Sequence, residues 1–132
     1  MDGTIRQRVK FATTPRDLYA TYLNSRAHSA ATGGKARIRA VVGAPFSAWD
    51  GYITGQNLLL LPGRRIVQSW RARDWSRVEL GSILILDFLA VPGGAELRLE
   101  HLRVPARHTR ELARGWRDYY WTPWKAYLKA RG

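Results

Sequence analysis

Residues 82–104, SILILDFLAV-PGG-AELRLEHLRV, contain two alternating segments on either side of a short break. In the second segment Leu97, Leu99 and His101 share one side, and the other side carries charged residues. Alternation with a period of two is typical of a strand with one buried face. Pro-Gly-Gly is a turn sequence, so the stretch predicts an antiparallel β-hairpin with an apolar face.

The region upstream predicts more strands of the same kind. Asp50-Gly51 and Pro62-Gly63 lie between short apolar segments and indicate two further hairpins. Residues 5–11 and 35–42 alternate apolar with mostly basic side chains, which predicts two strands with one charged face. Residues 73–80 show no period and are expected to form an irregular connection. A sheet of six or seven antiparallel strands follows.

Helix signals lie near the N-terminus. Thr14-Pro15 is typical of a helix start, with an N-cap hydroxyl followed by a proline at the first helical position. This helix is expected to end near Asn24. Ser25 is expected to cap a second short helix, which ends at Gly33-Gly34.

The C-terminal segment has the period of a long helix. Its aromatic face is expected to contain Leu112, Trp116, Tyr119, Tyr120, Pro123, Trp124 and Tyr127. Trp121 lies off this face and is expected to be exposed, and Pro123 is expected to kink the helix. The order of elements predicts an α+β fold in which this helix lies across the concave side of a curved sheet. That arrangement is a helix-grip fold.

Composition and charge limit the function classes. The chain has 132 residues and no cysteine, which predicts one domain over residues 1–132 and excludes disulfide scaffolds and thiol chemistry. The longest apolar run, residues 83–91, is far shorter than the roughly 20 residues of a membrane span. We therefore expect no membrane association and a cytoplasmic location. The net charge of +12 favours anionic partners or reflects the codon bias of a GC-rich bacterial genome.

Several motifs resemble one known family. They are Asp50-Gly51-Tyr52-Ile53-Thr54-Gly55, the segment PGRRIVQSWR at residues 62–71, Trp75, and Gly115-Trp116 followed by Tyr119-Tyr120. The chain resembles, from about residue 5 to residue 128, the C-terminal domain of activators of the 90-kDa heat-shock-protein ATPase. These proteins belong to the START and pollen-allergen-like (SRPBCC) helix-grip superfamily. The resemblance implies that the first strand pairs with both the second and the last, and that the C-terminal helix closes over a cavity.

The resemblance, together with strand parity, suggests which residues line that cavity. The sheet would contribute Phe46, Ile53, Trp70, Leu84, Leu86, Leu97, Leu99 and His101, and the helix would contribute Trp116, Tyr120 and Trp124. Such a lining would hold an apolar or amphipathic small molecule. The alternative is that these side chains fill a core.

Catalytic motifs are scarce. The sequence has no nucleophile elbow, dinucleotide-binding glycine motif or phosphate loop, so we expect no catalytic residue and no cofactor. His28, His101 and His108 lack metal-ligand spacing, so no metal site is expected. His101 is the polar group best placed to orient a ligand or act as a base. The alternative is a neutral core histidine with satisfied hydrogen bonds.

Two surfaces are candidate contact sites. The resemblance would place Arg6, Arg8, Arg37 and Arg39 on one convex surface that suits a chaperone or another acidic protein, unless it is a solvated face. Nucleic acid is disfavoured because no aromatic residues lie between these cations. On the strand at residues 82–91, three aliphatic side chains face away from the core, which predicts an exposed patch covered by a second copy or by a loop. They are Ile83, Ile85 and Leu89.

Three functions remain open at this point. The first is a non-catalytic binding protein for a small molecule. The second, implied by the resemblance, is a stress-related co-chaperone that contacts the 90-kDa heat-shock ATPase. The family's full co-chaperones add a separate N-terminal domain, for which 132 residues leave no room. The third is a cyclase-like or hydrolase-like enzyme of the superfamily, with His101 and the tyrosines as its polar groups.

Overall fold

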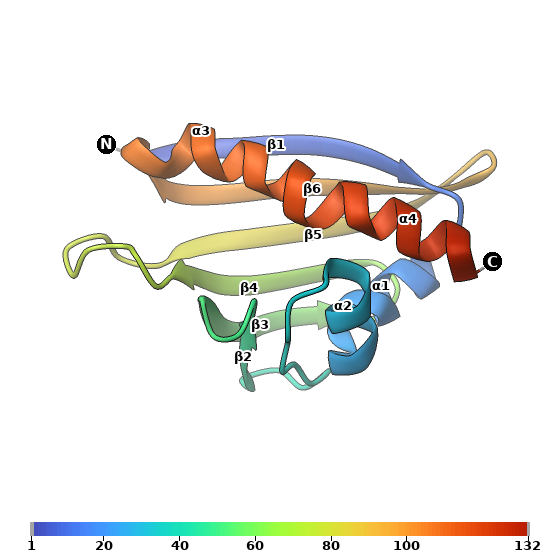
Figure 1. The fold of residues 1–132 in the computed structure, drawn as a ribbon, viewed down its shortest axis with the longest axis horizontal. Helices are drawn as coiled ribbons and strands as arrows, with labels where there is room; N and C mark the ends of the chain where they lie inside the picture. Colours follow the sequence, from blue (N-terminus) through green and yellow to red (C-terminus); the bar gives the residue numbers. More distant parts are fainter. Residues whose placement is uncertain (1, 132) are drawn as a thin grey trace.

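The computed structural model describes residues 2–131 as a six-stranded antiparallel sheet with a long helical stretch across one face (Figure 1). The strands are β1 (Asp2–Phe11), β2 (Pro45–Ala48), β3 (Ile53–Leu61), β4 (Arg65–Ala72), β5 (Ser82–Val91) and β6 (Gly94–Pro105). The helices are α1 (Pro15–Leu23), α2 (Ser25–Thr32), α3 (Ala106–Gly115), the π-helix η1 (Trp116–Trp121) and α4 (Thr122–Arg131). This confirms the expected helix-grip fold.

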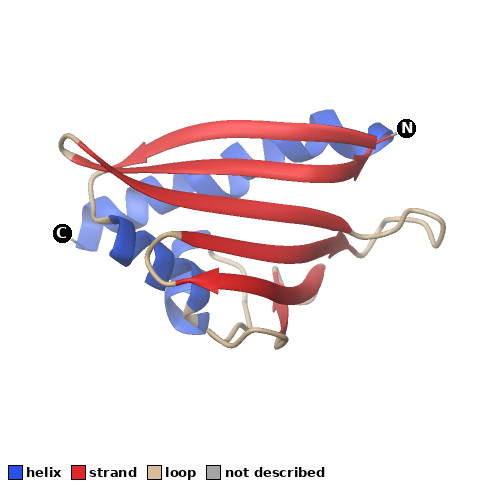
Figure 2. Ribbon diagram, turned by 180° about the vertical axis from the view of Figure 1, so that it is seen from behind, coloured by secondary structure: helices blue, strands red, loops and turns tan. Residues whose placement is uncertain are grey.

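The sheet order is β1-β6-β5-β4-β3-β2, so β1 and β2 lie at opposite edges. The β5–β6 hairpin pairs Leu86 with Leu99 and Phe88 with Leu97, which puts the alternating apolar residues on one face. Seen from behind, the strands lie in front of the C-terminal helical stretch, which covers only the concave face (Figure 2). The hairpin turns predicted at three positions are all present.

The predicted pairing of the first strand with residues 35–42 is wrong. These residues form an extended loop with one bridge, between Arg37 and Ser47 at the β2 edge. Two of their amides donate to side chains of α2: Ser25 Oγ accepts from the amide of Ile38 at 2.8 Å, and Ser29 Oγ accepts from the amide of Ala36 at 2.8 Å. The alternation therefore marks the buried side chains of Ala36 and Ile38, and the only strand pairing of this segment within the described chain is the single bridge to β2.

The short helices begin and end close to the predicted residues. Thr14 Oγ1 accepts from the amide of Asp17 at 3.0 Å, and Gly33 ends α2 in the left-handed conformation with φ of 89°. The cap of α2 is Asn24, whose Oδ1 accepts from the amide of Ala27 at 2.9 Å, and not Ser25 as the sequence predicts. Ser25 instead binds the loop that follows α2.

The C-terminal helical stretch differs from the expected regular helix. Trp121, expected to be exposed, is 3% exposed, whereas Tyr119, expected on the buried face, is 61% exposed. The cause is η1, in which the amide of Thr122 bonds the carbonyl of Arg117, five residues back. The π turn lies directly before Pro123, whose ring would clash with the carbonyl of Tyr119 in a regular α-helix. The wider turn brings Trp121 onto the buried side.

Within residues 2–131, no helix is both long enough and apolar enough to cross a membrane.

Candidate functional site

A cavity of about 410 Å³ lies between the β2–β3 turn, the end of β4 with the loop after it, and the helical segment α3–η1. This volume lies within the ~300–1,000 Å³ that small-molecule sites occupy. Seven of its thirteen lining residues are Trp or Tyr, and we call it the aromatic pocket. Its lining consists of Trp49, Tyr52, Ile53, Trp70, Asp74, Trp75, His108, Glu111, Leu112, Gly115, Trp116, Tyr119 and Tyr120.

The expected lining divides into two groups. Ile53, Trp70, Trp116 and Tyr120 do line the aromatic pocket. The remaining expected residues are buried in the core and do not reach it: Phe46, Leu84, Leu86, Leu97, Leu99, His101 and Trp124. The expected cavity and the expected filled core are therefore both present, at different positions along the C-terminal helical stretch.

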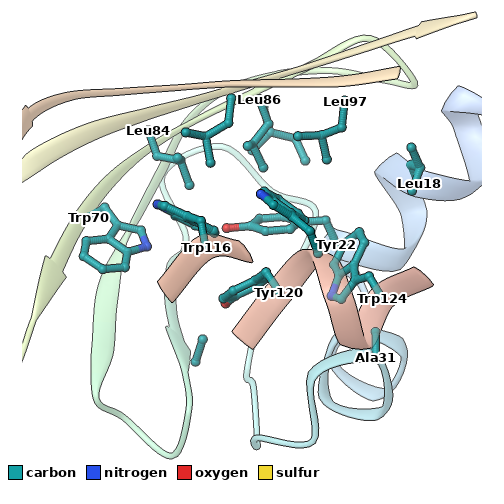
Figure 3. Close-up of a cluster of buried hydrophobic side chains, with 14 of the residues drawn as sticks. Leu18, Tyr22, Ala31, Trp70, Leu84, Leu86, Leu97, Trp116, Tyr120 and Trp124 are labelled. Carbon is teal, nitrogen blue, oxygen red and sulfur yellow. The ribbon is translucent and has the colours of Figure 1, made fainter. Parts of the chain in front are cut away.

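The filled part is an aromatic cluster between the sheet, α1 and α4. The Trp124 indole is fully buried, with its ring centroid 6.1 Å from that of Tyr22 and 6.2 Å from that of Phe11 (Figure 3). The Tyr22 hydroxyl donates to Gln68 Oε1 at 2.9 Å, and Gln68 Nε2 donates to Asn57 Oδ1 at 2.9 Å. These polar side chains are thus engaged within the protein.

His101 is a core histidine in this structure. Trp116 Nε1 donates to its Nδ1 at 3.1 Å, so Nε2 carries the proton and donates to Ser82 Oγ at 2.7 Å. Ser82 in turn donates to the carbonyl of Trp70 at 2.8 Å. Burial lowers the pKa of His101 to about 3, which keeps the ring neutral. Its role is to position Trp116 and Trp70, two walls of the aromatic pocket.

Tyr120 is anchored in a similar way. Its hydroxyl lies 3.0 Å from Nε2 of His28, whose Nδ1 lies 2.7 Å from the carbonyl of Tyr22. Since a carbonyl only accepts, Nδ1 carries the proton and Nε2 accepts from Tyr120. Burial lowers the pKa of His28 to about 4 and raises the pKa of Tyr120 well above its usual value. Tyr120 therefore presents its ring, with its hydroxyl already bonded.

Two indole donors of the aromatic pocket lack an acceptor. Trp49 Nε1 and Trp70 Nε1 are buried and have no hydrogen-bond partner among the described residues. Trp70 is 2% exposed, and its nitrogen edge is turned toward Trp116 and Tyr120, two other lining residues (Figure 3). A buried donor without an acceptor costs about 1–3 kcal/mol.

The rim of the aromatic pocket is polar and acidic. The Tyr52 hydroxyl donates to Asp74 Oδ1 at 2.9 Å, and Glu111 lines the same rim from α3. Burial, followed by the nearby carboxylates of Asp74 and Glu111, raises the pKa of Tyr52 to about 12. Both carboxylates therefore act on the Tyr52 hydroxyl.

The loop between β4 and β5 forms one wall and is held in place by Glu79. The Trp75 ring stacks on His108, with centroids 5.4 Å apart and 12° between the planes. Glu79 accepts two hydrogen bonds from Arg107 at 2.7 Å and lies 3.2 Å from His108 Nε2. The Arg107 hydrogen bonds, above all, hold the pKa of Glu79 well below its usual range. These contacts connect the loop to α3.

Sequence reasoning missed most of the rim. Trp49 and Tyr52 flank a turn, and Asp74 and Trp75 lie in an irregular loop, so neither strand nor helix periodicity applies to them. Tyr52 and Trp75 are part of the family motifs, which are the available signal. Among the described residues, no three His, Asp or Glu side chains gather so as to hold a metal ion.

The four arginines expected on one surface are divided between the two sheet edges. Arg6 and Arg8 lie on β1, and Arg6 pairs with Glu100 of β6 at 3.0 Å. Arg37 and Arg39 lie in the loop beside β2, at the opposite edge. The prediction of one shared basic surface is wrong because it depended on a strand pairing that does not form.

The expected apolar patch is only half exposed. Ile83, Ile85 and Leu89 lie on the outer face of β5, and each is half-buried. Cross-strand neighbours such as Val67 and Leu102 cover part of their area. A dimer formed through this face stays a prediction, which a single monomeric species in sedimentation at high micromolar concentration would contradict.

Comparison with known proteins finds a matching family and a human relative that belong to the same group of proteins. Residues 12–129 match the family described as Activator of Hsp90 ATPase homolog 1-like protein. The human protein named Activator of 90 kDa heat shock protein ATPase homolog 1 is 31% identical over 110 residues. The match covers 83% of this chain, which spans 32% of the human protein's length.

Two solved structures share the fold at low identity. The crystal structure of an HSP90 activator from Plasmodium falciparum has a TM-score of 0.78 and 20% identity over 90% of both chains. The solution structure of an Aha1 dimer from Colwellia psychrerythraea has a TM-score of 0.72 and 13% identity. That match covers 98% of this chain and 92% of the Colwellia chain.

Proposed function

Since the chain belongs to the family of Activator of Hsp90 ATPase homolog 1-like proteins, as its motifs indicate, we propose that it is a non-catalytic protein that binds a small molecule in the aromatic pocket. The supporting observation is a cavity of about 410 Å³ that is lined by four of the six tryptophans. Aromatic side chains give large apolar contact area and defined stacking geometry. The ligand would be apolar or amphipathic.

Gly115 provides a test that leaves the fold intact. It lies in the pocket lining with helical φ of −61° and ψ of −40°. The nearest atom to an added Cβ is Tyr119 Cδ2, at 3.7 Å. Gly115→Ala should stabilise the helix by about 1 kcal/mol, because alanine is the better helix former. Gly115→Leu should keep the fold and obstruct part of the cavity with its four-carbon side chain.

The measurement is thermal stabilisation by naphthalene-based probes, which match the aromatic walls. Ligand at 100 times its Kd adds about 2.7 kcal/mol to the stability of a protein that binds it. The wild type and Gly115→Ala should both be stabilised, and Gly115→Leu should be stabilised less. Equal stabilisation of Gly115→Leu, or no stabilisation of the wild type by any probe, would contradict the proposal.

Contact with the 90-kDa heat-shock ATPase is the second candidate function. Its support is the 31% identity to a human protein named as an activator of that ATPase. A cytoplasmic chaperone partner would bind through basic residues, and the two edges now allow separate tests. If an edge binds the chaperone, Arg6→Glu with Arg8→Glu, or Arg37→Glu with Arg39→Glu, should abolish salt-sensitive association in a pull-down. Gly115→Leu is the control and should leave association unchanged.

Loss of association in both double variants would indicate a nonspecific charge effect, and loss in neither would remove this candidate.

The enzyme alternative relied on His101 and Tyr120. Their polar atoms are engaged by Ser82, Trp116 and His28.

A further inference from the structure

The distribution of carboxylates indicates the charge of the ligand. Five carboxylates within residues 2–131 pair with arginines at 3.0 Å or less; they are Asp17, Glu79, Asp87, Glu96 and Glu100. Asp74 and Glu111 line the aromatic pocket, and neither forms a salt bridge within the described chain. Asp2, Asp50 and Asp118 also form no salt bridge within the described chain, but only Asp74 and Glu111 line the aromatic pocket together, where their charges act on the same molecule.

Arg107, a cation close enough to interact with Asp74, is already engaged. Glu79 holds both Arg107 Nε and Nη2 at 2.7 Å and is the main cause of the raised pKa of Arg107, to which Asp74 adds a smaller contribution. Arg73, next to Asp74 in the chain, donates to the carbonyl of Asp50 at 3.2 Å. The field of Asp74 and Glu111 therefore remains available to a ligand.

The aromatic side chains that form the walls of the pocket also favour a cation. Trp70 lies between two other indoles, with its ring centroid 5.7 Å from that of Trp75 and 5.9 Å from that of Trp116. Trp49 and Tyr119 form another aromatic pair at 5.7 Å. Tryptophan is the aromatic side chain that attracts cations most strongly through its ring face.

The unpartnered indole donors are a second, independent sign of a ligand. Trp70 Nε1 belongs to a side chain that is 2% exposed, and Trp49 Nε1 is equally inaccessible, yet neither has an acceptor among the described residues. Trp124 Nε1, in the filled core, also lacks an acceptor, but only Trp49 and Trp70 line the cavity, where a bound molecule can supply one. A ligand that matches both parts of the site carries a hydrogen-bond acceptor near the two indole N–H groups and a positive charge near the two rim carboxylates.

We infer that the ligand of the aromatic pocket is an organic cation: a protonated or quaternary amine on an apolar body that bears a hydrogen-bond acceptor. This inference rests on the proposed binding function and specifies its ligand class. The amine lies at the rim beside Asp74 and Glu111, and the apolar body lies among Trp49, Trp70 and Trp116.

The test uses three probes that share one ring system and differ in charge. They are 2-naphthylmethylamine, which is cationic at pH 7, the neutral 2-naphthalenemethanol and the anionic 2-naphthoate. Isothermal titration of the wild-type chain should give at least tenfold tighter binding of the amine than of the alcohol. The naphthoate should bind more weakly than the alcohol, and added salt should weaken the binding of the amine.

Charge removal then isolates the rim. Asp74→Asn with Glu111→Gln should lower the affinity for the amine at least tenfold and leave that for the alcohol within twofold. The amide oxygen that replaces the Asp74 carboxylate can still accept from the Tyr52 hydroxyl, so the local hydrogen bond is kept. Asp2→Asn with Asp118→Asn, at two exposed positions outside the lining, removes the same charge; it is the matched control and should change neither affinity.

The outcomes separate the two claims. If no probe binds the wild type, the proposed function itself fails. If the alcohol binds as tightly as the amine, or if the double variant weakens both probes equally, the aromatic pocket stands and the cation inference is wrong.

Discussion

Two buried histidines, His28 and His101, connect single residues to the stability of the whole chain. Both rings are neutral because each uses one nitrogen as donor and the other as acceptor within the core. Burial lowers their pKa values to about 4 and about 3. In the unfolded chain these rings bind protons near pH 6.5, so stability is complete above that pH and falls as the pH drops toward 4.

We expect the free energy of unfolding to fall by about 4 kcal/mol between pH 7.5 and pH 5, about 2 kcal/mol from each histidine. Asp17, whose pKa is also lowered, adds to the loss only below about pH 4.5, because carboxylates titrate there. Urea denaturation at the two pH values measures the difference. An unchanged free energy of unfolding would show that the two rings are protonated or accessible in the folded chain.

Among the elements, the π-helix η1 decides which aromatic residues enter the core. Trp121 stacks on Trp116 with 14° between the rings, and its Nε1 donates to Gln7 Oε1 at 2.8 Å. Tyr119 is 61% exposed and contacts the edge of Trp49. An α-helix turns by about 100° per residue, so the extra residue in the π turn rotates the positions after it relative to a regular helix. Trp121 is thereby buried in place of Tyr119.

Trp121→Ala should therefore lower the free energy of unfolding by about 3–5 kcal/mol, as for other buried aromatic residues. Tyr119→Ala should cost about 1 kcal/mol or less, because the side chain is mostly in solvent. Chemical denaturation of the pair provides the comparison. A larger loss of stability for Tyr119→Ala than for Trp121→Ala would contradict the π-helix and favour the regular α-helix that the sequence period predicts.

The same scale shows which elements can be predicted from the sequence. Asp50-Gly51, Pro62-Gly63 and Pro92-Gly93-Gly94 carry their turn chemistry locally, so the prediction of three hairpins is confirmed. Residues 35–42 alternate as a strand does, but their backbone bonds mainly serine hydroxyls of α2, the side chain of Asn57 and one residue of β2, which no pattern within 35–42 reveals. The π turn cannot be predicted from the period either, because an analysis of helical periodicity assumes the same number of residues per turn throughout the helix.

At the scale of the whole molecule, the aromatic pocket combines residues from distant parts of the chain. Trp70 and Trp116 are predictable because strand parity and the helical face indicate inward side chains. Trp49 and Asp74 are not, because turns and irregular loops acquire their direction only from tertiary packing. Sequence reasoning therefore identifies part of the aromatic walls and misses the acidic rim that gives the site its chemical character.

Native mass spectrometry of the chain purified without added ligand tests most directly whether the aromatic pocket binds a small molecule. We predict a species heavier than the 15.0 kDa chain by one small dissociable adduct. The adduct should be present in Gly115→Ala and reduced in Gly115→Leu, because only leucine obstructs the cavity. An adduct retained equally by Gly115→Leu would place the ligand elsewhere and contradict binding in the aromatic pocket.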